Sequence, residues 1–592
     1  MSRRRLQAVV AAISATTLVT LAYLPIIGQG FQSEDYLLLR WLGEHAPWTE
    51  EFGGFAQPWL GITAVGFYRP VATWVFAAER ALFGASILSY DLVHYAVHLL
   101  NCLLVFGVAR RMAVGRRGST VAALAFGLFP LAPDAVLFLA SFATLFGTLF
   151  FLLALWLFLE ERPALSKTAA IGACAASAAA LGSYEATVVG PVWMGLALWA
   201  RRPACISGRR VGSLATCVVM VLLYAALRVQ LFGSFLGGYR ETASVFSATE
   251  IQQLAVRCLA SLSRLIWPLS FGPPNPLRDG SVVLAWAAAL WFVLGFGERS
   301  GAPSAAGPPI LRWAVVGGVA VVVALAPFAF QPLVPGIGRY AYLAAVALAV
   351  GCGAVVGEVW ARRRSWQRNA SLGILAVGLV IHVLALAEVV VSHREARRLS
   401  SAVKTSLAIA AQRQGRTCFL AAVPWFVSRR GVPYASVLRY GIEDAVSPPF
   451  GFATSPVYPL PPSPPTLDMH RVLGSSACVL EWDGSAQRWE VVRPPDELPS
   501  ERFDASLDWD GAGRRVVRFE PRPGANHRGV FLTQGNATVV DASALGIEVP
   551  QDFLQTMARL YPATTVYWWV EVRDSGQQLL AASSLQSFPL SQ

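Results

Sequence analysis

The chain has 592 residues, of which 55% are hydrophobic and only 14% are charged, and its mean hydropathy is +0.50. Soluble domains carry roughly 25% charged residues, so this composition excludes a disordered chain or a typical soluble enzyme as the whole protein. Of the net charge of +12, residues 1–392 carry +11 and residues 393–592 carry +1. Basic residues fix the orientation of membrane domains, so the positive charge of residues 1–392 is explained without a nucleic-acid partner, and none is expected.

Apolar runs long enough to cross a bilayer follow one another through the first two thirds of the chain, since a spanning helix needs about 20 apolar residues. The first run follows Arg3, Arg4 and Arg5 and has a signal peptide as its alternative, but its length and the later runs favour a retained span. The eleven predicted spans are residues 6–27, 88–109, 119–137, 138–159, 168–183, 186–200, 211–232, 281–297, 312–329, 340–360 and 370–392.

The distribution of basic residues predicts the orientation. With the N-terminus inside, the predicted inner loops hold 19 of the 28 basic residues of the first 392. This agrees with the positive-inside rule, and an odd number of spans then places residues 393–592 outside. The apolar segment Ile251–Phe271 carries Arg257 and Arg264, so we expect it to lie flat at the interface instead of crossing.

The first outer loop, Gly28–Ile87, is rich in aromatic residues. Glu34 and Asp35 follow the first span directly, Trp41, Trp48 and Trp59 come next, and Tyr68-Arg69-Pro70 precedes an apolar stripe over Val71–Gly84. Such segments lie on membrane surfaces, so the loop predicts short interfacial helices that hold two acids at the mouth of the first span.

These features resemble the GT-C glycosyltransferases, and among them the protein O-mannosyltransferases, especially the transmembrane type that carries tetratricopeptide repeats in animals. The acidic pair and Tyr-Arg-Pro are followed by "LFGASILSYDLVHYAVHLLNCLLV", which also resembles the family. Three later stretches resemble further elements of the family, at residues 129–155, 181–191 and 338–350. The chain departs from the family where Phe129 replaces a usual His and Tyr184 replaces a usual Lys, and it has no such repeat. Because of these departures, the family's specificity for a mannose donor and a protein acceptor is not carried over to this chain.

The resemblance implies transfer of a sugar from a polyprenyl phosphate to an acceptor hydroxyl on the outer face, with inversion. It assigns the base to Asp35, with Glu34 as second choice; the alternative is a pair of solvated loop acids or a helix cap. Arg69, Arg339 and Tyr340 become candidates for the donor phosphate, which a guanidinium binds as a bidentate fork. The alternative for each arginine is a charge that reaches the headgroups.

Five further residues are candidates for the substrate cavity. Asp134 orients acceptor or sugar, or is a solvated loop acid; Glu185 lines the cavity or, as we favour, pairs with an arginine. His94 and His98 share a helix face, and their spacing would suit a metal site, but a packed, hydrogen-bonded face is favoured, with Asp91 orienting the His94 ring. No metal or other cofactor is expected. The complete cavity set is Tyr68, Asp134, Glu185, His94 and His98.

Residues 393–592 contain no further predicted span. We expect an extracytoplasmic α/β or linker region over 393–500, with a buried strand at Cys418–Val423, a hairpin around Asp483-Gly484 and a Pro-rich linker or surface loop at Ser447–Pro465. Cys418 and Cys478 are candidates for a disulfide. Residues 501–592 alternate as strands do and resemble the end of a fibronectin type III domain, which predicts a β-sandwich.

The sequence thus predicts a polytopic α-helical, GT-C-like membrane protein, with residues 1–392 as the membrane domain, in the inner membrane. Its expected partners are a polyprenyl-phosphate sugar, membrane lipids and an acceptor protein, lipid or envelope glycan. A transporter or flippase of lipid-linked sugars is the alternative, although only one short hairpin, residues 168–200, suggests the repeats it would need. A non-catalytic protein that presents the β-sandwich is the third possibility.

Overall fold

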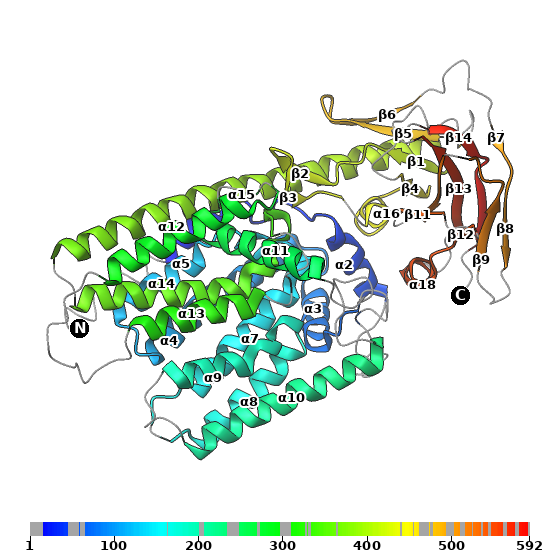
Figure 1. Cartoon of the computed structure of the whole chain (residues 1–592). Coiled ribbons are helices and arrows are strands. Elements are labelled where there is room, and N and C mark those ends of the chain that lie inside the picture. The colour runs from blue at the N-terminus through cyan, green and yellow to red at the C-terminus, as the bar shows by residue number, and fades with distance from the viewer. Residues whose placement is uncertain are drawn as a thin grey trace.

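A computed structural model shows a bundle of helices with a β-rich domain at one end (Figure 1). Arg3–Arg5 and Trp48 lie outside the residues that the structure describes. Those residues are 16–44, 59, 66–162, 164–200, 207–233, 248–268, 271, 273–295, 310–325, 328, 333–362, 365–438, 441–453, 455–460, 473, 478–492, 502–509, 515–523, 525–533, 537–542, 546–560, 565–574 and 579–589.

Five helices in the described part of the chain are long and apolar enough to cross a membrane, and shorter helices pack between them. The long ones are α4 (Ile87–Arg111), α7 (Phe142–Phe158, after η4 Leu139–Ser141), α10 (Gly208–Phe232), α14 (Tyr342–Arg362, after η8 Pro335–Ala341) and α15 (Ser365–Gln414). The shorter ones are α5 (Arg116–Gly127), α6 (Ala132–Val136), α8 (Lys167–Leu181), η5 (Glu185–Val189), α9 (Gly190–Ala200), α11 (Ala248–Ile266), α12 (Pro276–Gly295) and α13 (Ile310–Leu325).

One of the predicted spans is broken by residues that interrupt a helix. The run 119–137 divides into α5 and the short α6, because Pro130 and Pro133 cannot continue a helix. Helix α5 lies very close to α14, because a Cβ added to Gly118 would lie only 2.1 Å from the carbonyl oxygen of Gly353. Small residues permit such close helix contacts in membranes. The number of spans therefore stays a prediction, while the helical membrane domain itself is confirmed.

Helix α15 joins the bundle to the β-rich domain. It has 50 residues, which corresponds to a length of about 75 Å, against about 30 Å for the hydrocarbon layer. Its second half therefore projects beyond the bundle, as Figure 1 shows. The helix continues without interruption through Ala402–Ala411 to Gln414.

The first outer loop forms two helices in its described part, α2 (Glu34–Glu44) and α3 (Pro70–Phe83), which both lie at the end of the bundle nearest the β-rich domain (Figure 1). We call this the domain-facing end. Pro70 starts α3 because its fixed φ suits the first turn of a helix, and Gly84, at φ 57°, ends it. The predicted helix over the apolar stripe is confirmed.

The first part of the C-terminal domain is an α/β unit. Strand β1 (Cys418–Ala421) pairs in parallel with β4 (Val457–Pro459) and β5 (Cys478–Asp483), and β5 forms the predicted hairpin with β6 (Arg488–Val491). A separate hairpin, β2 (Phe426–Arg429) with β3 (Val432–Ser436), and the short α16 (Ile442–Val446) lie between them. The Pro-rich segment is therefore more than a linker, because β4 belongs to this sheet.

The rest of the domain contains two sheets whose apolar faces share one core, as a sandwich requires. It departs from the fibronectin type III pattern in two ways: α18 (Gln551–Leu560) is a helix, and β14 pairs in parallel with β7, whereas sandwiches of that kind are antiparallel. The strands are β7 (Arg502–Phe503), β8 (Ala505–Trp509), β9 (Arg515–Phe519), β10 (Asn526–Leu532), β11 (Ala537–Asp541), β12 (Ile547–Glu548), β13 (Thr565–Arg573), β14 (Leu579–Ser583) and β15 (Gln586–Pro589).

The first outer loop and the C-terminal domain contact each other directly. One hydrophobic core contains side chains of α2, α3 and the end of α7 together with side chains of α15, α16 and the C-terminal strands. Ser33 donates a backbone hydrogen bond of 2.7 Å to Val437, and Arg40 pairs with Asp444. Because the two parts touch, they lie on the same side of the membrane, whatever the number of spans between them.

Candidate functional site

Asp35 occupies a fully buried position at the start of α2. The chain turns sharply into this helix at Ser33, whose φ of 47° lies in the left-handed region. The carboxylate oxygens accept hydrogen bonds from two backbone amides, Ala140 at 3.0 Å and Gln32 at 3.1 Å. Burial raises the pKa of Asp35 to about 8, although these amides and the nearby Arg397 oppose the rise.

Arg397, on α15, is fully buried, and its charge acts on the Asp35 carboxyl. Sequence analysis did not single it out. It forms a bidentate ion pair with Asp91 at 2.7 and 2.9 Å, and it also donates to the carbonyls of Ile26 and Leu137. One guanidinium therefore ties the end of the first apolar run to α4, α6 and α15. A sequence signal existed, because Arg397 follows the last predicted span by little more than one helical turn.

Arg339 and Asp134 meet at the same end of the bundle. The Arg339 guanidinium lies 3.1 Å from the Asp134 carboxylate, and the Arg339 backbone amide donates to it at 3.0 Å. The Arg339 side chain keeps 21% exposure, whereas Asp134 keeps 3%. Asp134 is thus a buried partner of Arg339 and not a solvated loop acid.

Glu34 completes this group of charges. It is half-buried, its Oε2 finds no hydrogen-bond partner in the described part of the chain, and its charge acts on both Asp35 and Asp134. We call Glu34, Asp35, Asp134, Arg339 and Arg397 the domain-facing cluster. Three carboxyl groups and two guanidiniums within mutual electrostatic reach are typical of a functional site, since buried charges are costly.

A second ion pair lies near the loop. Arg69 donates to Glu185 through two nitrogens, at 2.8 and 2.5 Å, and its guanidinium stacks on Phe67, 4.0 Å from the ring centre. The pairing of Glu185 with an arginine is therefore present. Tyr68 is buried beside this pair and packs against Tyr224, on α10.

A stack of three aromatic rings connects the two charged groups. Phe328 lies between Tyr184 and Tyr340, with ring centres 5.8 and 4.7 Å apart and interplanar angles of 18° and 14°. Arg69 lies 5.7 Å from the Tyr184 ring and Arg339 lies 5.0 Å from the Tyr340 ring. The sequence-predicted donor residues Arg69, Arg339 and Tyr340 thus belong to one continuous arrangement.

The histidines of α4 have separate partners. His94 lies 3.1 Å from Glu79, whereas His98 lies 2.8 Å from the hydroxyl of Tyr342. The expectation that Asp91 orients His94 is wrong, because Asp91 is engaged by Arg397 and the residue beside His94 is Glu79. Among the described residues no group of three potential metal ligands occurs.

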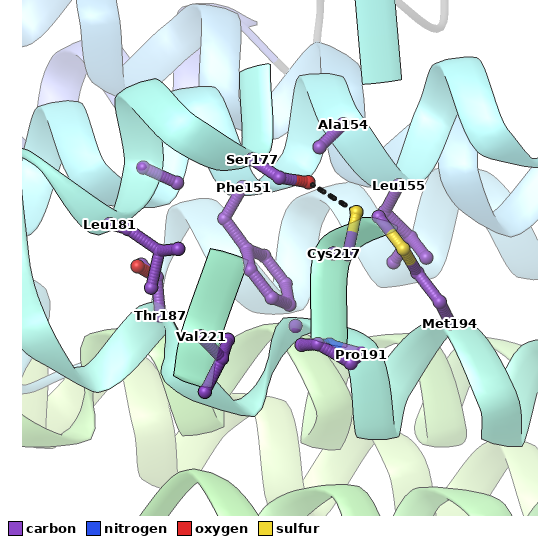
Figure 2. A pocket seen from close by; sticks show the side chains of 12 residues that line it. Phe151, Ala154, Leu155, Ser177, Leu181, Thr187, Pro191, Met194, Cys217 and Val221 are labelled. Carbon is purple, nitrogen blue, oxygen red and sulfur yellow. Dashed lines mark hydrogen bonds between the residues drawn. The ribbon is translucent and has the colours of Figure 1, made fainter. Parts of the chain in front are cut away.

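A small pocket between α7, α8, α9 and α10 is apolar (Figure 2). Figure 2 shows the hydrogen bond between Cys217 and Ser177 in the wall of this pocket, with Phe151, Leu155 and Met194 around them. The lining contains no charged side chain. It therefore offers packing space inside the bundle and no group for acid–base or phosphate chemistry.

Comparison with protein-family models finds no match, and comparison with curated proteins finds none either. Similar solved structures include ArnT from Cupriavidus metallidurans bound to undecaprenyl phosphate (14% identity, TM-score 0.40, 84% of this chain and 99% of that chain). They also include the Archaeoglobus fulgidus oligosaccharyltransferase with Zn and sulfate (12%, 0.36, 64% and 52%). The match thus spans about half of the archaeal chain. At these identities and scores we transfer no residue role from either protein.

Proposed function

We propose that the chain is a GT-C glycosyltransferase of the membrane, which moves a sugar from a polyprenyl-phosphate donor to an acceptor hydroxyl on the extracytoplasmic face, with inversion. The observation that carries this proposal is the buried carboxyl of Asp35. It lies at the domain-facing end and accepts hydrogen bonds from two backbone amides, with a pKa of about 8 and the Arg397 guanidinium nearby. A base with a pKa close to the working pH is the group that acceptor activation needs.

The proposed reaction uses the cluster as follows. Asp35 takes the proton of the acceptor hydroxyl while the acceptor oxygen forms a bond to the anomeric carbon. The bond between that carbon and the phosphate oxygen breaks, and the phosphate leaves with the electron pair. Developing negative charge on the phosphate requires fixed cations or hydrogen-bond donors.

Arg339 and Arg69, with Tyr340, supply these donors in the proposal. Each guanidinium already contacts a carboxylate, Asp134 or Glu185, which holds it in one orientation. A guanidinium has five N–H groups, so an arginine bound to a carboxylate retains donors for a phosphate. Asp134 and Glu185 are then positioning residues, and Glu34 is the second candidate base.

The remaining candidates form the wall of the proposed substrate cavity. Tyr68 adjoins Arg69, and hydrogen bonds hold His94 to Glu79 and His98 to Tyr342. We also propose a multi-pass inner-membrane protein with its N-terminus inside and residues 393–592 extracytoplasmic. The sugar and the acceptor class stay open.

Native mass spectrometry of the full chain in lipid discs tests this function. We would compare wild type, Asp35→Asn and Glu44→Gln, the last being an exposed acid at the end of the same helix. We expect a polyprenyl-phosphate sugar to be enriched in Asp35→Asn by about tenfold or more, because removal of a general base slows turnover by about 10²–10⁴. Glu44→Gln should behave as wild type.

Two results count against the proposal. Equal donor occupancy in wild type and Asp35→Asn would leave binding without transfer and would favour a transporter. Absence of any isoprenoid from all three proteins would remove the lipid-linked donor altogether.

A further inference from the structure

His393 is a buried histidine on α15. It has no exposed surface, and neither ring nitrogen finds a hydrogen-bond partner among the residues that the structure describes. A buried polar group left unpaired costs about 1–3 kcal/mol, and such groups are nearly always satisfied in native proteins. Both ring nitrogens of His393 are therefore available to a group from outside the described residues.

The surroundings of His393 indicate the charge of that group. Arg397 follows it by one helical turn on the same face, and both Arg397 and Arg339 act electrostatically on the imidazole. Burial disfavours a charge on the imidazole, and the two guanidiniums oppose a third positive charge, so the ring is neutral and has one N–H donor. Because Arg397 is paired with Asp91 and Arg339 with Asp134, the ring offers an anion an N–H donor near two guanidiniums that are already oriented.

Gln32, in the first outer loop, is a second buried polar side chain near the domain-facing cluster. Its side chain is fully buried, and both its amide oxygen and its amide nitrogen lack partners within the described ranges. Its backbone amide is one of the two that hold Asp35. The loop that carries Gln32 runs along α15: Gly30 lies against the carbonyl of Arg397, and Arg397 donates to Ile26. Unpaired polar groups therefore approach the cluster from both the first outer loop and α15.

We propose that His393 binds the phosphate of the polyprenyl carrier, its imidazole N–H donating to a phosphate oxygen beside Arg339. This assignment rests on the proposed function and adds a ligand-binding residue from α15 to it. The same chemistry recognises the donor and the polyprenyl phosphate released after transfer. His393 adds a directional hydrogen bond without a further full charge.

The test compares two lipids that differ only in the phosphate. Undecaprenyl phosphate and undecaprenol are titrated separately into the full chain in lipid discs, and bound fractions are read by native mass spectrometry. We expect His393→Ala to weaken binding of undecaprenyl phosphate by about tenfold or more, because hydrogen bonds to charged groups contribute about 1.5–3 kcal/mol. Binding of undecaprenol should not change.

Two further variants make the result specific. His393→Gln retains an N–H donor and should recover most of the phosphate preference. His382→Ala is the matched control on the same helix, because both nitrogens of His382 lie within 2.9 and 3.2 Å of the carbonyls of Gly378 and Leu265. It should alter thermal stability without altering the preference between the lipids.

The failure of this inference differs from the failure of the proposed function. If His393→Ala binds both lipids as wild type does, a water molecule satisfies the ring and the inference is overturned, even where Asp35→Asn accumulates donor. If His393→Ala loses the phosphate preference but Asp35→Asn accumulates no donor, the inference stands and transfer by Asp35 does not.

Discussion

Neighbouring residues at the start of α2 have different environments. Asp35 is fully buried and accepts hydrogen bonds from two amides, whereas Glu34 is half-buried, and its Oε2 has no partner among the residues that the structure describes. Successive residues of a helix point about 100° apart, so only one of the two acids faces the interior. This assigns the base role in the proposed reaction to Asp35 and leaves Glu34 to adjust its charge.

The pH dependence of transfer should follow Asp35. The ordinary pKa of this carboxyl is 3.8 and burial raises it to about 8, so below pH 8 the protonated, inactive form predominates. We expect the rate at saturating donor to rise about tenfold per pH unit up to pH 8 and then to level off. Initial rates between pH 6 and 9.5 check this.

Glu34→Gln refines the same measurement. The Glu34 charge raises the pKa of Asp35, so its removal should move the midpoint of the profile to lower pH while transfer persists. A profile that is flat between pH 6 and 9 would contradict the role of Asp35. Loss of transfer in Glu34→Gln with an unchanged midpoint would exchange the roles of the two acids.

The Arg397–Asp91 pair should be needed for stability. Arg397→Ala leaves the fully buried Asp91 carboxylate without its cation, which typically costs about 3–5 kcal/mol. We expect a clearly lower Tm in detergent, partly restored when Asp91→Ala is added. Arg398→Ala, the exposed neighbour on α15, should leave Tm unchanged. An equal effect of both arginine variants would mean that this pair has no special role.

At the scale of elements, β1 and β5 bring two thiols together. Cys418 and Cys478 are direct neighbours across parallel strands, with their sulfur atoms 3.0 Å apart. The hydrogen bond between the two thiols lowers the pKa of the Cys478 thiol, which favours the reactive thiolate. These positions are therefore prepared for oxidation wherever the compartment supplies a thiol oxidant.

We predict a disulfide between them in protein from native membranes. Two thiols lose two protons and two electrons to a thiol-oxidising protein, and the closed loop of about 60 residues should stabilise the domain by about 4 kcal/mol. Alkylation before and after reduction, followed by peptide mass spectrometry, detects the pair. Full alkylation of both cysteines before reduction would contradict it and would also weaken the extracytoplasmic placement of the domain.

At the scale of the whole molecule, contact between distant segments fixes their common side. The first outer loop and residues 393–592 share one core, so an even number of spans separates them. The eleven predicted spans satisfy this condition, since ten follow the loop. The C-terminal domain thereby covers α2, the helix that carries Asp35.

Reporter fusions should show this arrangement. Alkaline phosphatase fused after Gln592 should be active and green fluorescent protein at the same place dark, because the first folds outside and the second inside. A fusion within the predicted inner loop at residues 160–167 should give the opposite pair of signals. Equal signals at both positions would contradict the proposed orientation.

The sequence by itself determined the elements, because each depends on local properties of the chain. Apolar runs predicted membrane helices, Pro70 and the stripe after it predicted α3, and alternation around Asp483-Gly484 predicted the β5–β6 hairpin. The acidic pair was also evident from its place after the first apolar run. Local patterns predicted wrongly in two places. The run 119–137 was predicted as one span although Pro130 interrupts it, and the fibronectin type III resemblance did not predict the parallel pairing of β14 with β7.

Only the tertiary structure decided which charges meet. Asp91 was expected beside His94, three residues further along the same helix, but it pairs with Arg397, which lies 306 positions along the chain. His393 and Gln32 had no signal in the sequence, because an unpaired polar group is defined by what surrounds it in space. Desolvation and ion pairing depend on the packing of α2, α4, α6, η8 and α15 around one point, and no single segment contains that information.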